Sequence, residues 1–327
     1  MADEPKLSVI VVSPLDFAYI RRTVSHLRDQ TIANQIELIP VAPNAESLED
    51  ATEADYAGFA EVNPFYTGEP IENVDDAAGL VMLKGKSDIV ACVEDHAFPE
   101  PGWAEAILAA HDGTWAMIGS AVINANPDSG LSWANQLMAY GHYSEPIQGG
   151  ERSIVSRHNA SYKKSVLEAY GDRLQALFIR GGGLIETLRA DGHKMYLAEH
   201  ARIHHLNPSN ISSTSELRFF AGRLAAGSKG AREGWSLPKR LIEAMLCVLQ
   251  PVRRFKRIAG KVFSPVQRGR LLRLLPALAY VMTLDGLGQF LGCLIGPGKA
   301  GERLAEFEYD RLRHLNAKDR STFSQPV

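Results

Sequence analysis

The stretch "VACVEDHAFPEPGW" (90–103) places metal-competent side chains directly after an apolar run. Glu94, Asp95 and His96 follow Val93, and a proline-bracketed turn leads into a helix-like segment. Alternate residues of an extended chain point to one side, so we expect Glu94 and His96 to face together. A carboxylate with an imidazole suits Mn²⁺, whereas Mg²⁺ prefers oxygen ligands. The triplet therefore predicts a divalent-cation site, although acids at a strand end also commonly cap the next helix.

Strands and helices are expected to alternate along the first part of the chain. Short apolar runs predict strands at 7–12, 36–42, 88–93, 115–123 and 193–207. Helical spacing of apolar residues is seen at 15–29, 74–84, 103–111, 130–140 and 182–191. This alternation predicts an α/β fold with a mostly parallel, Rossmann-like sheet flanked by helices. Ligands bind such sheets beyond the carboxyl ends of the strands, where Pro14 and Glu94 fall.

The chain changes character after about residue 212, so we expect two parts, 1–212 and a helical extension at 213–327. Helices are expected at 214–232 and 237–250, and residues 237–275 contain ten Lys and Arg but one acid, Glu243. The apolar stretch 274–284 has 11 residues. Because about 20 residues are needed to span a bilayer, we do not expect a transmembrane helix.

The basic clusters of the extension, which alternate with Leu, Phe and Val, fit a helix pair lying on an anionic membrane surface. An apolar hairpin that packs on the first part of the chain, or on a second copy in a homodimer, is the alternative. A nucleic-acid partner is not expected, because the extension lacks aromatic stacking positions.

The cysteines and the start of the chain indicate a compartment. Cys92, Cys247 and Cys293 lie far apart in apolar surroundings, which is typical of core residues in a reducing compartment. The start "MADEPKLSVIVV" lacks the basic segment and long apolar run of a signal peptide. We therefore expect a cytoplasmic protein, peripheral on the inner face of the cell membrane.

Four blocks, in this order and spacing, resemble the family 2 glycosyltransferases, which use the GT-A fold for nucleotide-diphospho-sugars. They are "SPLD" (13–16), "EDHAFPEPGW" (94–103), "NASYKKSVL" (159–167) and "LRADGHKMY" (188–196), the last followed by "ARIHH" (201–205). Together they cover roughly residues 7–207. The resemblance implies a GT-A sheet, with the extension outside it.

The resemblance also implies site residues. Donor binding is expected at Pro14, Asp16, Glu94, Asp95 and Asn159. His205, or its neighbour His204, is expected to join Glu94 and His96 around Mn²⁺ or Mg²⁺. The family's catalytic base aligns with 180–183, where this chain has no carboxylate, and Glu186 is the nearest acid. Asp75 and Asp76 are interpreted as solvated carboxylates at a helix start, and the alternative is that they approach the nucleotide.

The function that the resemblance implies is inverting, metal-assisted transfer of a sugar from a UDP- or GDP-sugar. The acceptor is expected to be a glycan or a lipid-linked glycan of polysaccharide biosynthesis. The alternative is a catalytically silent GT-A-like scaffold subunit of a membrane glycan-synthesis complex. It rests on the missing base and on "APNA" (42–45), which stands where many family members carry "DDGS".

Overall fold

The computed structural model describes residues 4–141, 143, 147–262 and 268–325. The chain forms two compact units. The sheet unit comprises residues 1–123 and 147–205, and the helical unit comprises residues 124–146 and 206–325. This division differs from the expected 1–212 and 213–327, because the segment 124–146 belongs to the helical unit. Ala134 and Leu137 of this segment pack into a buried cluster with Leu278.

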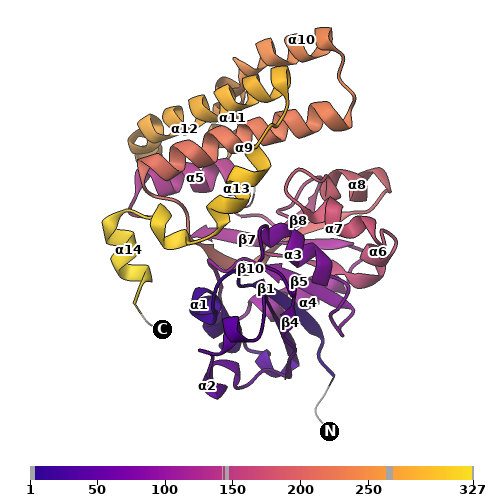
Figure 1. Cartoon of the computed structure of the whole chain (residues 1–327). Helices are drawn as coiled ribbons and strands as arrows, with labels where there is room; N and C mark the ends of the chain where they lie inside the picture. Colours follow the sequence, from indigo (N-terminus) through magenta and orange to yellow (C-terminus); the bar gives the residue numbers. More distant parts are fainter. Residues whose placement is uncertain (1–3, 142, 144–146, 263–267, 326–327) are drawn as a thin grey trace. The chain divides into compact units, whose positions relative to one another are not determined.

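The sheet unit is built on one mixed sheet (Figure 1). Its strands are β1 (Leu7–Val12), β2 (Ile36–Ala42), β3 (Glu61–Val62), β4 (Phe65–Tyr66), β5 (Ile89–Val93), β6 (Ala97–Pro99), β7 (Met117–Asn124), β8 (Gly150–Arg152), β9 (Ala160–Lys163) and β10 (Met195–His205). The strand order is β3-β2-β1-β5-β9-β7-β10-β6, while β4 pairs with β2 and β8 with β10.

The sheet has a parallel half and a half with antiparallel pairs. β1 runs parallel to β2 and β5, and β2 runs parallel to β3 and β4. Every residue of β1 is buried, as expected for a β-branched run covered on both faces. The α/β fold expected from the sequence is thus confirmed. Antiparallel pairing begins at β9, which lies between β5 and β7, and also joins β10 to β6 and β8.

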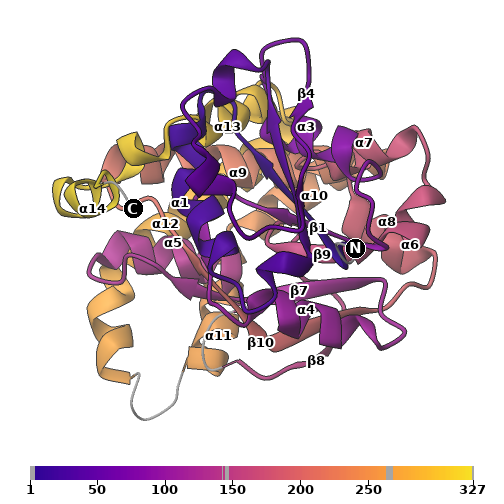
Figure 2. The same cartoon turned by 90° about the horizontal axis from the view of Figure 1, so that it is seen from below.

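Helices flank this sheet, as Figures 1 and 2 show. They are α1 (Phe17–Arg28), α2 (Glu53–Tyr56), α3 (Val74–Val81), α4 (Trp103–His111), α6 (Lys164–Glu168), α7 (Arg173–Phe178) and α8 (Leu184–Ala190). α1 contacts β6, α3 contacts β1, and α4 contacts β10. Asp16 begins α1, and its side chain accepts a hydrogen bond from the Tyr19 amide.

The helical unit contains α5 (Gly130–Tyr140), α9 (Ile211–Arg232), α10 (Leu237–Cys247), α11 (Gln250–Val262), α12 (Arg268–Ile295), α13 (Ala300–Glu308) and α14 (Ala317–Phe323). α12 packs along α9 and also contacts α5, α10 and α11. Glycines allow the close approach of α9 and α12. A Cβ atom on Gly288 would lie 2.0 Å from the Phe219 carbonyl oxygen, so a larger side chain there would push the two helices apart.

The segment Leu272–Ile295 of α12 is long and apolar enough to cross a membrane by length and composition. Half of its most apolar window is buried inside the structure. Leu278, Val281 and Met282 contribute to this burial by packing against α5. Burial of this kind is also typical of the core helix of a globular unit.

Candidate metal and donor site

Three side chains converge beyond the carboxyl end of β5. A carboxylate oxygen of Glu94 and the imidazole nitrogens of His96 and His205 all lie within 4.8 Å of one another. The two Nε2 atoms are 3.0 Å apart, and Glu94 Oε2 lies 3.4 Å from His205 Nε2 and 4.0 Å from His96 Nε2. Both imidazoles are buried. We call this group the Glu-His-His cluster.

Glu94 is held from two sides. Its backbone N–H donates to Asn159 Oδ1 at 3.1 Å, and Asn159 Nδ2 donates to Glu94 Oε2 at 2.6 Å. Asn159 is fully buried and has a left-handed backbone, with φ of 54°, a conformation that asparagine tolerates better than most residues. From α1, the Thr23 hydroxyl donates to the Asp95 carbonyl oxygen at 2.7 Å and fixes the loop. Asn159 therefore orients the carboxylate.

His205 reaches the cluster because β10 pairs with β6. In this antiparallel pair His205 lies opposite Ala97, the residue next to His96. His204 points away, because neighbouring strand residues alternate, and its Nε2 lies 2.8 Å from Glu100 Oε1. Of the two histidines considered from the sequence, the structure thus brings His205 to Glu94 and His96.

Asp95 sets the tautomer of His96. Its Oδ1 lies 2.7 Å from His96 Nδ1, so a neutral His96 donates Nδ1–H to the carboxylate and presents the Nε2 lone pair to the cluster. Metal bonds of about 2.0–2.2 Å to nitrogen and oxygen place neighbouring ligand atoms about 3 Å apart. The separations of 3.0 to 4.0 Å within the cluster are close to this value. The donor set therefore fits a divalent cation.

The charge of Glu94 suits a cation. Burial alone would raise its pKa, but electrostatic interaction with His96, His158 and His205 and a hydrogen bond to His205 hold the pKa well below its usual range. The carboxyl group is therefore ionised at neutral pH.

Replacing Asp95 by asparagine is expected to weaken Mn²⁺ binding by about 10- to 100-fold, because the amide no longer stabilises the Nδ1–H tautomer of His96. Titration calorimetry of the metal-free protein with Mn²⁺ measures the effect. Asp88→Asn, at the exposed opposite end of β5, is the matched control and should bind as the wild type does. Equal affinities of Asp95→Asn and the wild type would show that Asp95 does not position His96.

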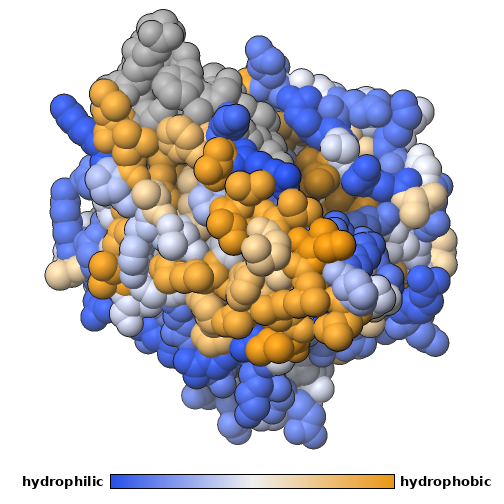
Figure 3. Space-filling view, turned by 90° about the horizontal axis from the view of Figure 1, so that it is seen from above, coloured by the Kyte–Doolittle hydropathy of each residue, from blue (hydrophilic) through white to orange (hydrophobic). Residues whose placement is uncertain are grey.

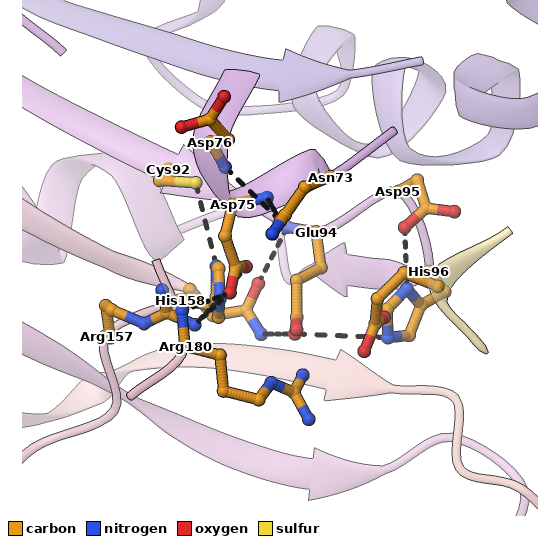
Figure 4. Close-up of polar contacts among 12 residues, drawn as sticks. Asn73, Asp75, Asp76, Cys92, Glu94, Asp95, His96, Arg157, His158 and Arg180 are labelled. Carbon is orange, nitrogen blue, oxygen red and sulfur yellow. Dashed lines mark hydrogen bonds and ion pairs between the residues drawn. The ribbon is translucent and has the colours of Figure 1, made fainter. Parts of the chain in front are cut away.

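A second charged group lies beside the cluster (Figure 4). Asp75, on the first turn of α3, is 4% exposed and accepts from Arg157 Nη2 at 2.8 Å. Its other oxygen, Oδ1, lies 2.8 Å from His158 Nε2, whereas the Arg180 amide donates at 2.8 Å to Oδ2, the oxygen that Arg157 also contacts. Burial would raise the pKa of Asp75, but Arg157, His158 and Arg180 hold it far below its usual range.

This group corrects one interpretation of the sequence. Asp75 is not a solvated carboxylate, because Arg157 and His158, distant in sequence, cover it. Residues 157–159 contact both Asp75 and Glu94 and so link the two groups. The buried Nη1 of Arg157 has no hydrogen-bond partner among the described residues.

The other predicted site residues lie elsewhere in the sheet unit. Pro14 is buried and Asp16 is exposed, where its carboxylate caps α1. Glu186 lies exposed on the first turn of α8. The structure therefore brings together five residues of the second and third sequence blocks and β10, namely Glu94, Asp95, His96, Asn159 and His205.

No protein-family model and no curated protein matches the chain. Its fold is similar to that of S. aureus TarS, with 14% identity and a TM-score of 0.46 over 88% of this chain and 55% of the TarS chain. For TarS 1-349 the identity and TM-score are the same, over 88% and 90% of the two chains. GalNAc-T7, crystallised with UDP, GalNAc and Mn²⁺, gives 14% identity and 0.45 over 62% of this chain and 43% of the other. This chain thus spans about half of the full TarS and GalNAc-T7 chains. Similarity at this level assigns neither an activity nor a ligand.

Proposed function

We propose that this chain is a metal-dependent glycosyltransferase. The observation that carries the proposal is the convergence of Glu94, His96 and His205 beyond the carboxyl end of a parallel strand, the position at which α/β sheets bind ligands. The four sequence blocks that resemble family 2 glycosyltransferases supply the reaction class. The donor is accordingly a UDP- or GDP-sugar, and transfer proceeds with inversion.

The chemistry requires a stabilised diphosphate leaving group. A divalent cation supplies this by neutralising the negative charge that develops on the phosphate oxygens. Glu94, His96 and His205 would hold the cation, while Asp95 and Asn159 orient two of these ligands. Arg157, which is paired with Asp75 beside the cluster, adds a nearby positive charge.

The acceptor hydroxyl must lose a proton to a positioned base. Glu186 is the carboxylate that we propose for this role, and its exposure on α8 leaves it accessible to an acceptor. The acceptor is a glycan or a lipid-linked glycan, which is large enough to need an open face of the sheet unit.

Incubating the protein with UDP- and GDP-sugars and Mn²⁺ tests the proposal. We expect release of the nucleoside diphosphate, which a chelator abolishes and an acceptor glycan accelerates. Glu186→Gln should lower kcat by roughly 100-fold or more while Mn²⁺-dependent nucleotide binding persists. Absence of hydrolysis, transfer and nucleotide binding would overturn the proposal. Binding without turnover by the wild type would favour the scaffold alternative.

A further inference from the structure

The helical unit exposes a continuous apolar stripe along α10 and the start of α11. Six aliphatic side chains are each more than half exposed: Leu237, Leu241, Ile242, Met245, Val248 and Val252. Leu237, Leu241 and Met245 recur at steps of four residues, which places them on one side of α10, while Val248 lies in the turn after α10 and Val252 on the first turn of α11. We call these six residues the α10 stripe. Figure 3, which looks onto the side where Figure 1 draws α10, shows a broad apolar area.

A water-exposed helix buries its large apolar side chains, whereas α10 leaves most of them on the outside. Its small residues Ala244 and Cys247 face inward, in a cluster with Trp235 and Cys293. The half-buried Arg240 donates from Nε to the Trp235 carbonyl oxygen, just before the start of α10, at 3.1 Å. The large aliphatic side chains are left on the outside, and exposed apolar areas of this kind mark binding surfaces.

Cations adjoin the stripe. Arg253 and Lys256 are exposed on α11, and Lys256 follows Val252 by one helical turn, so the stripe ends on a positive charge. A further ion pair lies behind it, where Arg254 Nη1 is 3.3 Å from the buried Asp285 carboxylate. Between residues 237 and 256 the sequence has five Lys and Arg and one acid, Glu243. The surface therefore combines aliphatic side chains with net positive charge.

We propose that the α10 stripe and its flanking cations bind the surface of an anionic lipid bilayer. Aliphatic side chains enter the boundary between headgroups and acyl chains, while Lys and Arg contact the anionic headgroups. The charge argues against a second copy as the occupant, because a two-fold interface brings the same surface of both copies together and would oppose two cationic segments. The inference goes beyond the proposed function, since it concerns where the protein binds and not what it transfers.

Co-sedimentation of the full chain with vesicles tests the proposal, with neither metal nor nucleotide present. We expect binding to vesicles of equal phosphatidylglycerol and phosphatidylcholine, weak binding to pure phosphatidylcholine, and loss of binding when salt rises from about 0.05 M to about 0.5 M. Leu241→Glu/Met245→Glu should bind at least about ten-fold more weakly. Ile154→Glu/Ile211→Glu replaces two equally exposed aliphatic residues elsewhere and should bind as the wild type does.

Three results would overturn the proposal. The first is equal binding of the wild type to anionic and neutral vesicles, and the second is equal binding of the stripe variant and its control. The third is a wild-type dimer in light scattering that Leu241→Glu/Met245→Glu separates into monomers without any vesicle binding, which would assign the stripe to a second copy. Circular dichroism of both variants confirms that they are folded. Because no donor or cation enters the assay, its outcome is independent of the transferase proposal.

Discussion

Replacing Glu94 by glutamine will lower the affinity for Mn²⁺ by roughly 100-fold or more and abolish any metal-dependent release of nucleoside diphosphate. The amide keeps the size of the side chain and can still contact Asn159, but it removes the negative charge that faces His96 and His205. Titration calorimetry with Mn²⁺ alone gives the affinity, and nucleotide binding with and without Mn²⁺ gives the coupled effect. The double variant Glu94→Ala/His96→Ala should lose Mn²⁺-dependent nucleotide binding entirely.

Glu100→Gln is the matched control. Glu100 also contacts a histidine of β10, with its Oε1 2.8 Å from His204 Nε2, but on the other side of the strand pair. It carries the same charge and undergoes the same change, so it should retain wild-type Mn²⁺ affinity. Unchanged affinity in Glu94→Gln, or an equal loss in Glu100→Gln, would contradict the assignment of the cation to the Glu-His-His cluster.

Replacing Asp75 by asparagine will destabilise the sheet unit by about 3–5 kcal/mol, because it leaves the partly buried guanidinium of Arg157 without its counter-charge. The effect depends on pH. The pKa of Asp75 is lowered in the folded protein, so its contribution is fully present above the unfolded pKa of about 4 and is lost as the pH falls below it. Urea unfolding at neutral pH and in the acid range measures both the loss and its pH dependence.

The neighbouring Asp76→Asn serves as its control. Asp76 Oδ1 accepts one hydrogen bond from Gln175 Nε2 at 3.0 Å and lacks the two ion pairs of Asp75. Its substitution should cost about 1 kcal/mol or less. If Asp75→Asn lowers the free energy of unfolding by only about 1 kcal/mol or less, the buried ion pairs contribute little to stability. That result would contradict the structural role given to Asp75.

The sequence predicted the elements that are defined locally. The run 7–12 became β1 with the expected bounds, because Ser13-Pro14 ends an unbroken β-branched segment. The helix expected at 103–111 is α4, which begins after Pro101-Gly102. Glu94 and His96 were expected to face together as alternate residues of an extended chain, but they meet in a tight turn, in which the Ala97 N–H donates to the Glu94 carbonyl oxygen at 3.0 Å.

The third histidine depended on pairing between distant segments. A proline-bracketed turn was expected after His96, but Ala97–Pro99 forms the short strand β6. Its register with β10, more than a hundred residues later in the chain, decides that His205 and not His204 joins the cluster. The sequence of neither segment determines that register. His204 and His205 are neighbours in an extended run, and either could face Glu94 until the pairing with β6 is known.

The burial of Asp75 and the exposure of the α10 stripe could not be predicted from the local sequence for a related reason. A carboxylate at a helix start is solvated unless distant residues cover it, as Arg157 and His158 do here. Likewise, a helical apolar pattern shows that a stripe exists but not whether it faces a core or the solvent. Ala244 and Cys247 occupy the inward side of α10, and this leaves the larger residues outside.

Anomalous X-ray diffraction from a crystal of the wild-type protein soaked with Mn²⁺ and a nucleoside diphosphate tests the central claim most directly. The account predicts a manganese peak bonded to Glu94 Oε2, His96 Nε2 and His205 Nε2, with a phosphate oxygen of the nucleotide completing its coordination. A nucleotide bound at the carboxyl ends of the strands with manganese elsewhere, or manganese in the Glu-His-His cluster with no nucleotide beside it, would contradict the account.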